Sequence, residues 1–216
     1  MLDVHSPHEP IIGWKDFFLH LFTITIGLLI ALSLEGAVEW NHHRHLVHDA
    51  EASLFHEIQS NALALTDAVS DLHKQRDELQ HDIVVLNELI KTNKLPDHEH
   101  MTVTFHIKTF DNLGWKTAQA TGAAAYMPYA DAQEYDGIYS TQDELADSEK
   151  QAARDAILAL APFMESVDNA PDPTSSEAKM IKDRIQTLEG QILLVDSLMG
   201  SLDGQYKKFL SAHPAH

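Results

Sequence analysis

Four residues that follow a long apolar stretch have side chains and spacings suited to binding a divalent metal ion. The segment 42–49 reads HHRHLVHD, and its candidate ligands are His42, His45, His48 and Asp49. Residues three or four positions apart lie on one face of a helix, so two imidazoles, or an imidazole and a carboxylate, can share one ion. The alternative is a polar collar whose charge changes with pH, because histidine titrates near neutrality. The spacing alone leaves both interpretations open.

No other group of residues predicts catalysis. The chain has no G-x-S-x-G, no G-x-x-x-x-G-K-[ST], no G-x-G-x-x-G and no H-E-x-x-H motif. It has no cysteine, which excludes disulfides, thiolate metal sites and cysteine nucleophiles. Its 33 Asp and Glu residues make chance pairs of carboxylates common, so such pairs indicate a solvated surface rather than an acid and base. We therefore expect a protein that is not an enzyme and binds no cofactor, except for the metal ion that the histidines would hold.

The histidines follow the most informative element of the chain, an apolar segment at residues 17–34. It reads FFLHLFTITIGLLIALSL, eighteen residues with His20 as the one ionisable side chain. A helix of this length rises about 27 Å, enough to cross the hydrocarbon core of a bilayer. No basic region precedes it and no A-x-A cleavage site follows it, which favours an uncleaved anchor over a signal peptide. Trp14 and Trp40 flank it, as aromatic residues do at the headgroup level. The predicted organisation is an irregular lead, a transmembrane anchor helix and an extramembrane helical domain, at residues 1–13, 14–40 and 41–216.

Polar and small residues of the anchor share one stripe, because they recur every three or four positions. The stripe consists of His20, Thr23, Gly27, Ala31 and Glu35. Gly27 and Ala31 form a small-xxx-small pair that lets two helices approach closely in lipid. We expect the stripe to mediate self-association into a homo-oligomer. Two alternatives stay open: an ion path with Glu35 as a selectivity ring, and a lone helix whose polar ends reach the two interfaces.

Two heptad patterns predict two long helices that pack together. The first has apolar residues at Ile58, Ala62, Leu65, Val69, Leu72, Leu79, Ile83, Leu86 and Ile90, with Arg76 in the remaining slot. We expect the charged Arg76 to specify the register of this seam at a cost in stability. The second has apolar residues at Ile181, Ile185, Leu188, Ile192, Val195, Met199, Leu202, Tyr206 and Phe209. A helix start is indicated at Thr174–Glu177, where capping residues follow Pro173.

Shorter elements lie between the two patterns. Residues 102–110 alternate weakly, and we favour a short helix or an extended linker over a strand that would lack a partner. Residues 115–126 predict a helix, and residues 130–164 predict another that is interrupted near Gly137 and broken at Pro162. The expected fold is therefore all-α: one N-terminal transmembrane helix that continues into an antiparallel helical bundle with two long heptad-patterned helices.

The layout resembles a family of uncharacterised bacterial single-pass membrane proteins with a TIGLLIAL-type anchor and a helical domain of unknown function. The matching residues are Thr25–Leu32 in the anchor and Glu39-Trp40 after it, with a weaker match at Trp115, Gly122, Tyr135 and Tyr139. The resemblance implies a bacterial membrane protein and implies no activity. Lys15 lies closer to its end of the span than Arg44 does, which favours the N-terminus inside and the helical domain in the periplasm.

These features predict a membrane-anchored, self-associating helical scaffold or accessory subunit at the bacterial inner membrane. Its expected partners are the lipid bilayer and either further copies of itself or a larger membrane protein complex. A net charge of −18 excludes nucleic acid as a partner, because phosphates require a basic surface. The alternative function is an oligomeric ion-conducting or metal- or pH-sensing membrane protein.

Overall fold

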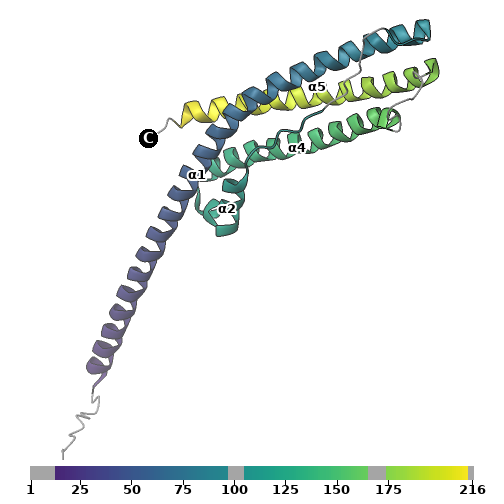
Figure 1. Cartoon of the computed structure of the whole chain (residues 1–216). Coiled ribbons are helices and arrows are strands. Elements are labelled where there is room, and N and C mark those ends of the chain that lie inside the picture. The colour runs from purple at the N-terminus through teal and green to yellow at the C-terminus, as the bar shows by residue number, and fades with distance from the viewer. Residues whose placement is uncertain (1–12, 97–104, 165–173, 214–216) are drawn as a thin grey trace, which may run out of the picture. The chain divides into compact units, whose positions relative to one another are not determined.

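The computed structural model describes residues 13–96, 105–164 and 174–213, and every regular element within these ranges is a helix. The helices are α1 (Trp14–Thr92), α2 (Leu113–Thr121), α3 (Ala123–Tyr126), α4 (Tyr129–Met164) and α5 (Ser175–Ala212) (Figure 1). The predictions of an all-α fold and of one long apolar helix near the N-terminus are confirmed. The predicted lead lies outside the described residues, except for Gly13.

The chain divides into two compact units, Met1–His48 and Asp49–His216, here called unit 1 and unit 2. Helix α1 contributes residues to both units, and α2 to α5 belong to unit 2. The division falls within the histidine segment and not at Trp40, where the sequence predicts the end of the anchor.

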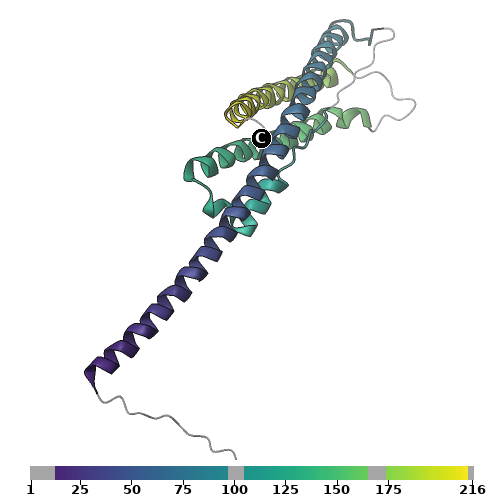
Figure 2. The same cartoon turned by 90° about the vertical axis from the view of Figure 1, so that its left-hand side faces the viewer.

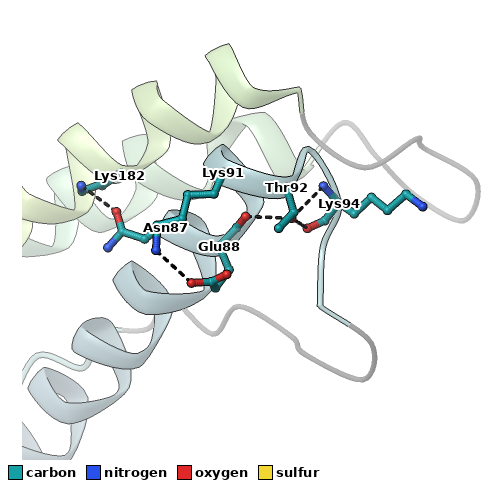
Figure 3. A network of polar contacts seen from close by, with 6 residues as sticks. All are labelled: Asn87, Glu88, Lys91, Thr92, Lys94 and Lys182. Carbon is teal, nitrogen blue, oxygen red and sulfur yellow. Dashed lines mark hydrogen bonds and ion pairs between the residues drawn. The ribbon is translucent and has the colours of Figure 1, made fainter.

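Helix α1 continues to Thr92 because its sequence contains no proline, and it ends where a left-handed residue turns the chain. Asn93 has a φ of 56°, a conformation that asparagine tolerates better than most residues at a helix C-terminus. The Thr92 hydroxyl donates to the Glu88 carbonyl at 2.8 Å and accepts from the Lys94 amide at 3.3 Å (Figure 3). One side chain therefore bonds to the backbone on both sides of the helix end.

Helix α5 lies beside α1 within unit 2 and runs in the opposite direction. Near the end of α1, Lys182 of α5 donates to the Asn87 side chain at 2.8 Å (Figure 3). Earlier in α1, His73 contacts Asp196 of α5 at 3.2 Å. The partners therefore follow one another in reverse order along the two helices.

Helices α4 and α5 also lie side by side and run in opposite directions, as two views of the chain show (Figure 1, Figure 2). Gln205 of α5 donates to the Thr141 hydroxyl at 2.9 Å. At the far end of the pair, the guanidinium of Arg184 donates to the Leu158 carbonyl. Since α5 is antiparallel to both α1 and α4, the last two run in the same direction.

Helix α4 passes through two residues that predict interruptions, so both of those predictions are wrong. A glycine in a helix costs about 1 kcal/mol, and at Gly137 the buried neighbours Ile138 and Tyr139 hold the helix in place. Pro162 has no N–H to offer the carbonyl of Leu158 one turn earlier. That carbonyl instead accepts the hydrogen bond from Arg184 described above, which satisfies the group that proline leaves free.

The start of α5 agrees with its sequence signal. The Thr174 hydroxyl accepts from the Glu177 amide at 3.3 Å, and the Glu177 carboxylate accepts from the Thr174 amide at 2.7 Å. This is the capping box that the sequence predicts. All nine residues of the second heptad pattern are buried, from Ile181 to Phe209.

Residues 105–112 form neither a helix nor a strand, and we call them the strap. The strap bonds to Gln75 of α1 through its His106 amide and to Asn61 through Asp111. Fourteen residues of helix separate Asn61 from Gln75 by about 21 Å. The five steps from His106 to Asp111 span about 17 Å at full extension, so the strap must be nearly extended and the two side chains cover the remaining distance. The strap is therefore the extended linker that the sequence leaves open. It carries the chain back along α1 and lets α4 start parallel to it.

Candidate functional site

The apolar segment of unit 1 is uncovered by the rest of the chain. Its eighteen-residue window has a mean hydropathy of 2.3 and no buried residue, and it is the one helix in the described part of the chain long and apolar enough to cross a membrane. The exposed side chains surround the helix: Phe17, Phe18, Leu21, Phe22, Ile24, Leu28, Leu29, Ile30 and Leu32 are among them. A helix that is apolar on every side needs an apolar environment on every side.

Polar side chains within this segment are bonded to the helix itself. The hydroxyls of Thr23 and Thr25 donate to the carbonyls of Leu19 and Leu21 at 2.9 and 2.8 Å. His20 Nδ1 lies 2.9 Å from the Asp16 carbonyl, an arrangement in which this nitrogen carries the proton. Such local bonds satisfy polar groups in hydrocarbon without a partner helix.

The predicted stripe is entirely exposed in unit 1. His20, Thr23, Gly27, Ala31 and Glu35 all face away from the rest of the chain, and a Cβ added at Gly27 would meet nothing within 4 Å. The stripe is therefore open to a second helix. Its role in self-association stays a prediction.

Aromatic residues mark both ends of the apolar segment. Trp14 packs with Phe17 and Phe18 at ring-centroid distances of 6.3 and 6.2 Å, and the Arg44 guanidinium lies 5.6 Å from the ring centre of Trp40. The two tryptophans are separated by about 39 Å of helix, close to the thickness of a bilayer that includes its headgroup regions. Their positions fit the two interfaces of one membrane.

The candidate metal ligands are exposed along α1. His42, His45, His48 and Asp49 all face solvent. Among the residues that the structure describes, no three histidine or carboxylate side chains are placed together to hold a metal ion. The site therefore stays a prediction that would need ligands from another molecule or a rearrangement of side chains.

A second polar arrangement, which the sequence did not indicate, surrounds the strap in unit 2. The Asn61 side-chain amide donates to the Asp111 carbonyl at 2.7 Å and accepts from the Asp111 amide at 3.0 Å. The Gln75 side chain accepts from the His106 amide at 2.9 Å. Asn61 is 3% exposed and Gln75 is 6% exposed, so both are interior groups of α1. They supply hydrogen bonds that an extended segment cannot make within itself.

Helix α4 contacts the strap from its other side. Gln142, which is buried, donates to the Asp111 carbonyl at 3.4 Å, and the buried Glu149 accepts from the Lys108 amide at 3.4 Å. The other oxygen of Glu149 is buried without a partner in the described part of the chain. Burial raises the pKa of Glu149 to about 7, and the Lys108 amide opposes this rise. This carboxyl therefore changes charge near neutral pH inside the bundle.

Glu57 joins α1 to the start of α2 and to α4. Its carboxylate accepts from the Gly114 amide at 2.7 Å and from the Tyr139 hydroxyl at 2.6 Å. Gly114 is in the first turn of α2, where a carboxylate is favourable to the helix dipole. A Cβ at Gly114 would lie 3.2 Å from this carboxylate, so glycine permits the close approach. Trp115 stacks on Tyr139 at 5.9 Å and 7°.

Tyrosine side chains close this end of the bundle. Burial is the main cause that raises the pKa of Tyr135, Tyr139 and Tyr206 above the ordinary range, and Glu57 contributes at the last two. The Tyr206 hydroxyl lies beside the amides of Asn61 and Gln142, without a hydrogen bond of normal geometry among the described residues. These groups hold protons at any physiological pH, so they have a structural and not an acid–base role.

The predicted seam of α1 is placed partly as expected. Leu65, Leu72, Leu79 and Leu86 are buried. Arg76 is partly exposed, and the buried polar residue of this turn is its neighbour Gln75. Gln75 faces inward, and its side chain bonds to the strap. The role of Arg76 in setting the register of the seam stays a prediction.

Sequence reasoning missed Glu57, which bonds to α2, and the residues that hold the strap: Asn61, Gln75, Gln142 and Glu149. One signal was available in α1. Asn61, Gln75 and Asp82 lie at multiples of seven positions from the buried Leu54 and Leu89. Residues seven apart share one face of a helix, so this spacing marks the three polar residues as interior positions.

Comparisons with known proteins give no relatives. No known protein family matches the chain, and no similar protein was found among curated sequences or solved structures. The resemblance of residues 25–40 to a bacterial membrane-protein family stays a hypothesis.

Proposed function

We propose that the protein is a membrane-anchored helical scaffold or accessory subunit that acts by binding other proteins, including copies of itself, and not by catalysis. The observation that carries the proposal is the apolar segment of unit 1, whose side chains are exposed around the whole helix. Moving one large apolar side chain out of water is favourable by roughly 1.5 to 3 kcal/mol. For about twenty such side chains, the summed free energy exceeds any cost of inserting the few polar groups of this unit.

The polar interior of unit 2 supports the non-catalytic part of the proposal. Its polar side chains are engaged with the chain's own backbone. The buried Asn61, Gln75 and Gln142 bond to the strap, as does one oxygen of the buried Glu149. The half-buried Glu57 bonds to α2. Their arrangement serves to fix a long segment between helices. We interpret unit 2 as an antiparallel bundle with coiled-coil-type seams on α1 and α5, an architecture suited to docking.

The membrane placement follows from the same segment and its flanks. We propose a single pass through the bacterial inner membrane with the N-terminus inside and unit 2 in the periplasm. Because the polar groups near the start of the stripe bond to their own helix, the arrangement favours an anchor over an ion path.

Membrane insertion is tested with the full-length chain and a variant that carries Ile26→Lys and Leu29→Lys. Each lysine costs about 2.5 to 3.5 kcal/mol at the centre of a span, so the variant should leave the membrane fraction after alkaline extraction while the original chain stays. If both proteins are extracted equally, the anchor assignment is wrong.

Self-association through the stripe is tested with Gly27→Leu in detergent-solubilised protein. Gly36→Leu is the matched control, because 100° per residue places Gly36 on the opposite face and a Cβ at either glycine would meet nothing within 4 Å. Native mass spectrometry should show fewer subunits for Gly27→Leu and no change for Gly36→Leu. Equal behaviour of the two variants would remove the stripe from the proposal.

A further inference from the structure

One face of α1 connects the small residues of the anchor to two histidines. From Gly27 and Ala31, alternating steps of three and four positions follow one face of the helix, which is the spacing of a coiled-coil seam. In this register the face consists of His20, Ile24, Gly27, Ala31, Leu34, Val38, Asn41, His45 and His48. We call it the anchor seam; all nine residues are exposed and belong to unit 1.

The anchor seam changes from apolar to polar beyond the membrane-spanning segment. Its residues from Ile24 to Val38 are small or apolar, and its last two positions are His45 and His48. These two imidazoles therefore lie where two helices that pack along the seam would still be in contact. By contrast, at about 3.5 residues per turn the neighbouring His43 lies on the opposite face of the helix.

Two copies in one membrane bring these histidines to the same level. The same apolar segment sets the orientation and the depth of both copies, so their anchors are parallel and in register. In a contact along the anchor seam, each seam residue then faces the same residue of the second copy across a two-fold axis. His45 faces His45 and His48 faces His48, and the two layers are about 4.5 Å apart along the axis.

Four imidazoles in two neighbouring layers match the coordination of a zinc-type ion. Such an ion takes four ligands in a tetrahedral arrangement, with nitrogen at about 2.0 to 2.1 Å. Packed helix axes are about 8 to 10 Å apart, so an imidazole from either helix reaches an ion on the axis between them. Among the described residues of one copy, no three histidine or carboxylate side chains are grouped for a metal ion. The second copy supplies the two ligands that one copy lacks.

Charge favours a cation at this contact. The net charge of −18 makes two copies repel one another, and Glu35 and Glu39 follow the apolar segment just before the histidines. A divalent cation on the axis offsets this repulsion where the seam has no apolar side chains left to hold the helices together. Imidazole nitrogen suits Zn²⁺, Ni²⁺ and Cu²⁺, whereas Mg²⁺ and Ca²⁺ prefer oxygen ligands.

We propose that His45 and His48 of two parallel copies together bind one divalent transition-metal ion of the zinc type. The proposal deepens the self-association proposed above, on which it rests for the pairing of the anchors. Of the candidate ligands within unit 1, it uses the two that lie on the anchor seam, and His42, one position past Asn41, is not required.

The test uses the full-length chain in detergent, stripped of metal by a chelator and titrated with Zn²⁺ in a calorimeter. One Zn²⁺ should bind for every two chains, and Mg²⁺ should give no comparable binding. His45→Gln and His48→Gln should each weaken zinc binding by about tenfold or more, because glutamine is polar but lacks the imidazole nitrogen. His43→Gln, on the opposite face of the same helix, is the matched control and should bind Zn²⁺ as the original chain does.

The site is wrong if the original chain binds no Zn²⁺, if it binds one ion for each chain, or if His43→Gln loses as much affinity as His45→Gln. Self-association is decided separately, by the subunit count of the metal-free protein in native mass spectrometry. His45→Gln and His48→Gln keep the small residues of the anchor and should still associate. Gly27→Leu should dissociate and weaken zinc binding with it, and unchanged zinc binding by Gly27→Leu would show that the ligands do not come from copies paired along the seam.

Discussion

Glu149 offers the sharpest test of how the strap is held. Its carboxyl is 1% exposed, accepts one long hydrogen bond from the Lys108 amide, and has its second oxygen buried without a partner in the described residues. Burial raises its pKa from an ordinary value of 4.5 to about 7. The folded chain therefore holds this proton more tightly than the unfolded chain does.

The sign of the pH dependence follows from linkage. Between pH 4.5 and 7 the folded state binds more protons at Glu149, so the free energy of unfolding falls as pH rises through this window and levels off above it. A rise in pKa of this size corresponds to about 3 kcal/mol, of which about 2.5 kcal/mol develops between pH 5 and pH 8. Glu149→Gln removes the ionisation and keeps the shape and an oxygen for the Lys108 amide.

We expect Glu149→Gln to unfold at higher urea concentration than the original chain at pH 8, and the advantage to shrink by about 2.5 kcal/mol at pH 5. The fluorescence of Trp115, buried against Tyr139, reports on this unit in a background that carries Trp14→Phe and Trp40→Phe. Glu144→Gln, at an exposed position of the same helix, is the matched control. A stability difference between Glu149→Gln and the original chain that is the same at both pH values would refute the reasoning.

Four further substitutions test the packing of unit 2. Asn61→Leu leaves the Asp111 N–H without a partner and its carbonyl with only the 3.4 Å bond from Gln142. It should lower the free energy of unfolding by about 1 to 4 kcal/mol in urea titrations, and a smaller loss would mean that the strap is not held there. Gln75→Leu should lower the free energy of unfolding by about 1 to 3 kcal/mol, whereas Arg76→Leu should change it by less than about 1 kcal/mol. A larger effect at Arg76 than at Gln75 would show that Arg76 is the seam residue of this turn. Gly137→Ala should stabilise the chain by about 0.5 to 1 kcal/mol in thermal unfolding, because a Cβ there meets nothing within 4 Å; destabilisation would show that the glycine serves a contact.

The α5 helix shows what local pattern alone can predict. Its apolar residues recur without a break, its capping residues stand at the right distance before it, and all nine residues of the pattern are buried. The apolar segment of unit 1 was equally readable, because its composition over eighteen consecutive residues suffices to show a helix long and apolar enough to cross a membrane. In both cases every residue needed for the inference lies within the element itself.

The seam of α1 shows where this reasoning fails. Apolar periodicity selects Ala62, Val69 and Ile83, which are partly exposed, over the residues that precede them, Asn61, Ala68 and Asp82, which are buried. At Asn61 the polar residue is the inward one because an extended strap lies against α1, and the Asp111 backbone takes both its hydrogen bonds to α1 from this side chain. Pro162 makes the same point, since α4 continues past it while Arg184 of α5 bonds to the carbonyl that the proline leaves free.

The sequence by itself determined the helical class, the apolar helix and the inward face of α5, because hydrophobic burial depends on residues that are close together along the chain. The tertiary structure alone decided what the inward polar residues of α1 and α4 bind, since their partners are backbone groups some thirty to fifty positions away. It also decided that α4 runs parallel to α1. A hydrogen bond is satisfied only by a partner in space, and no local pattern records where that partner will be.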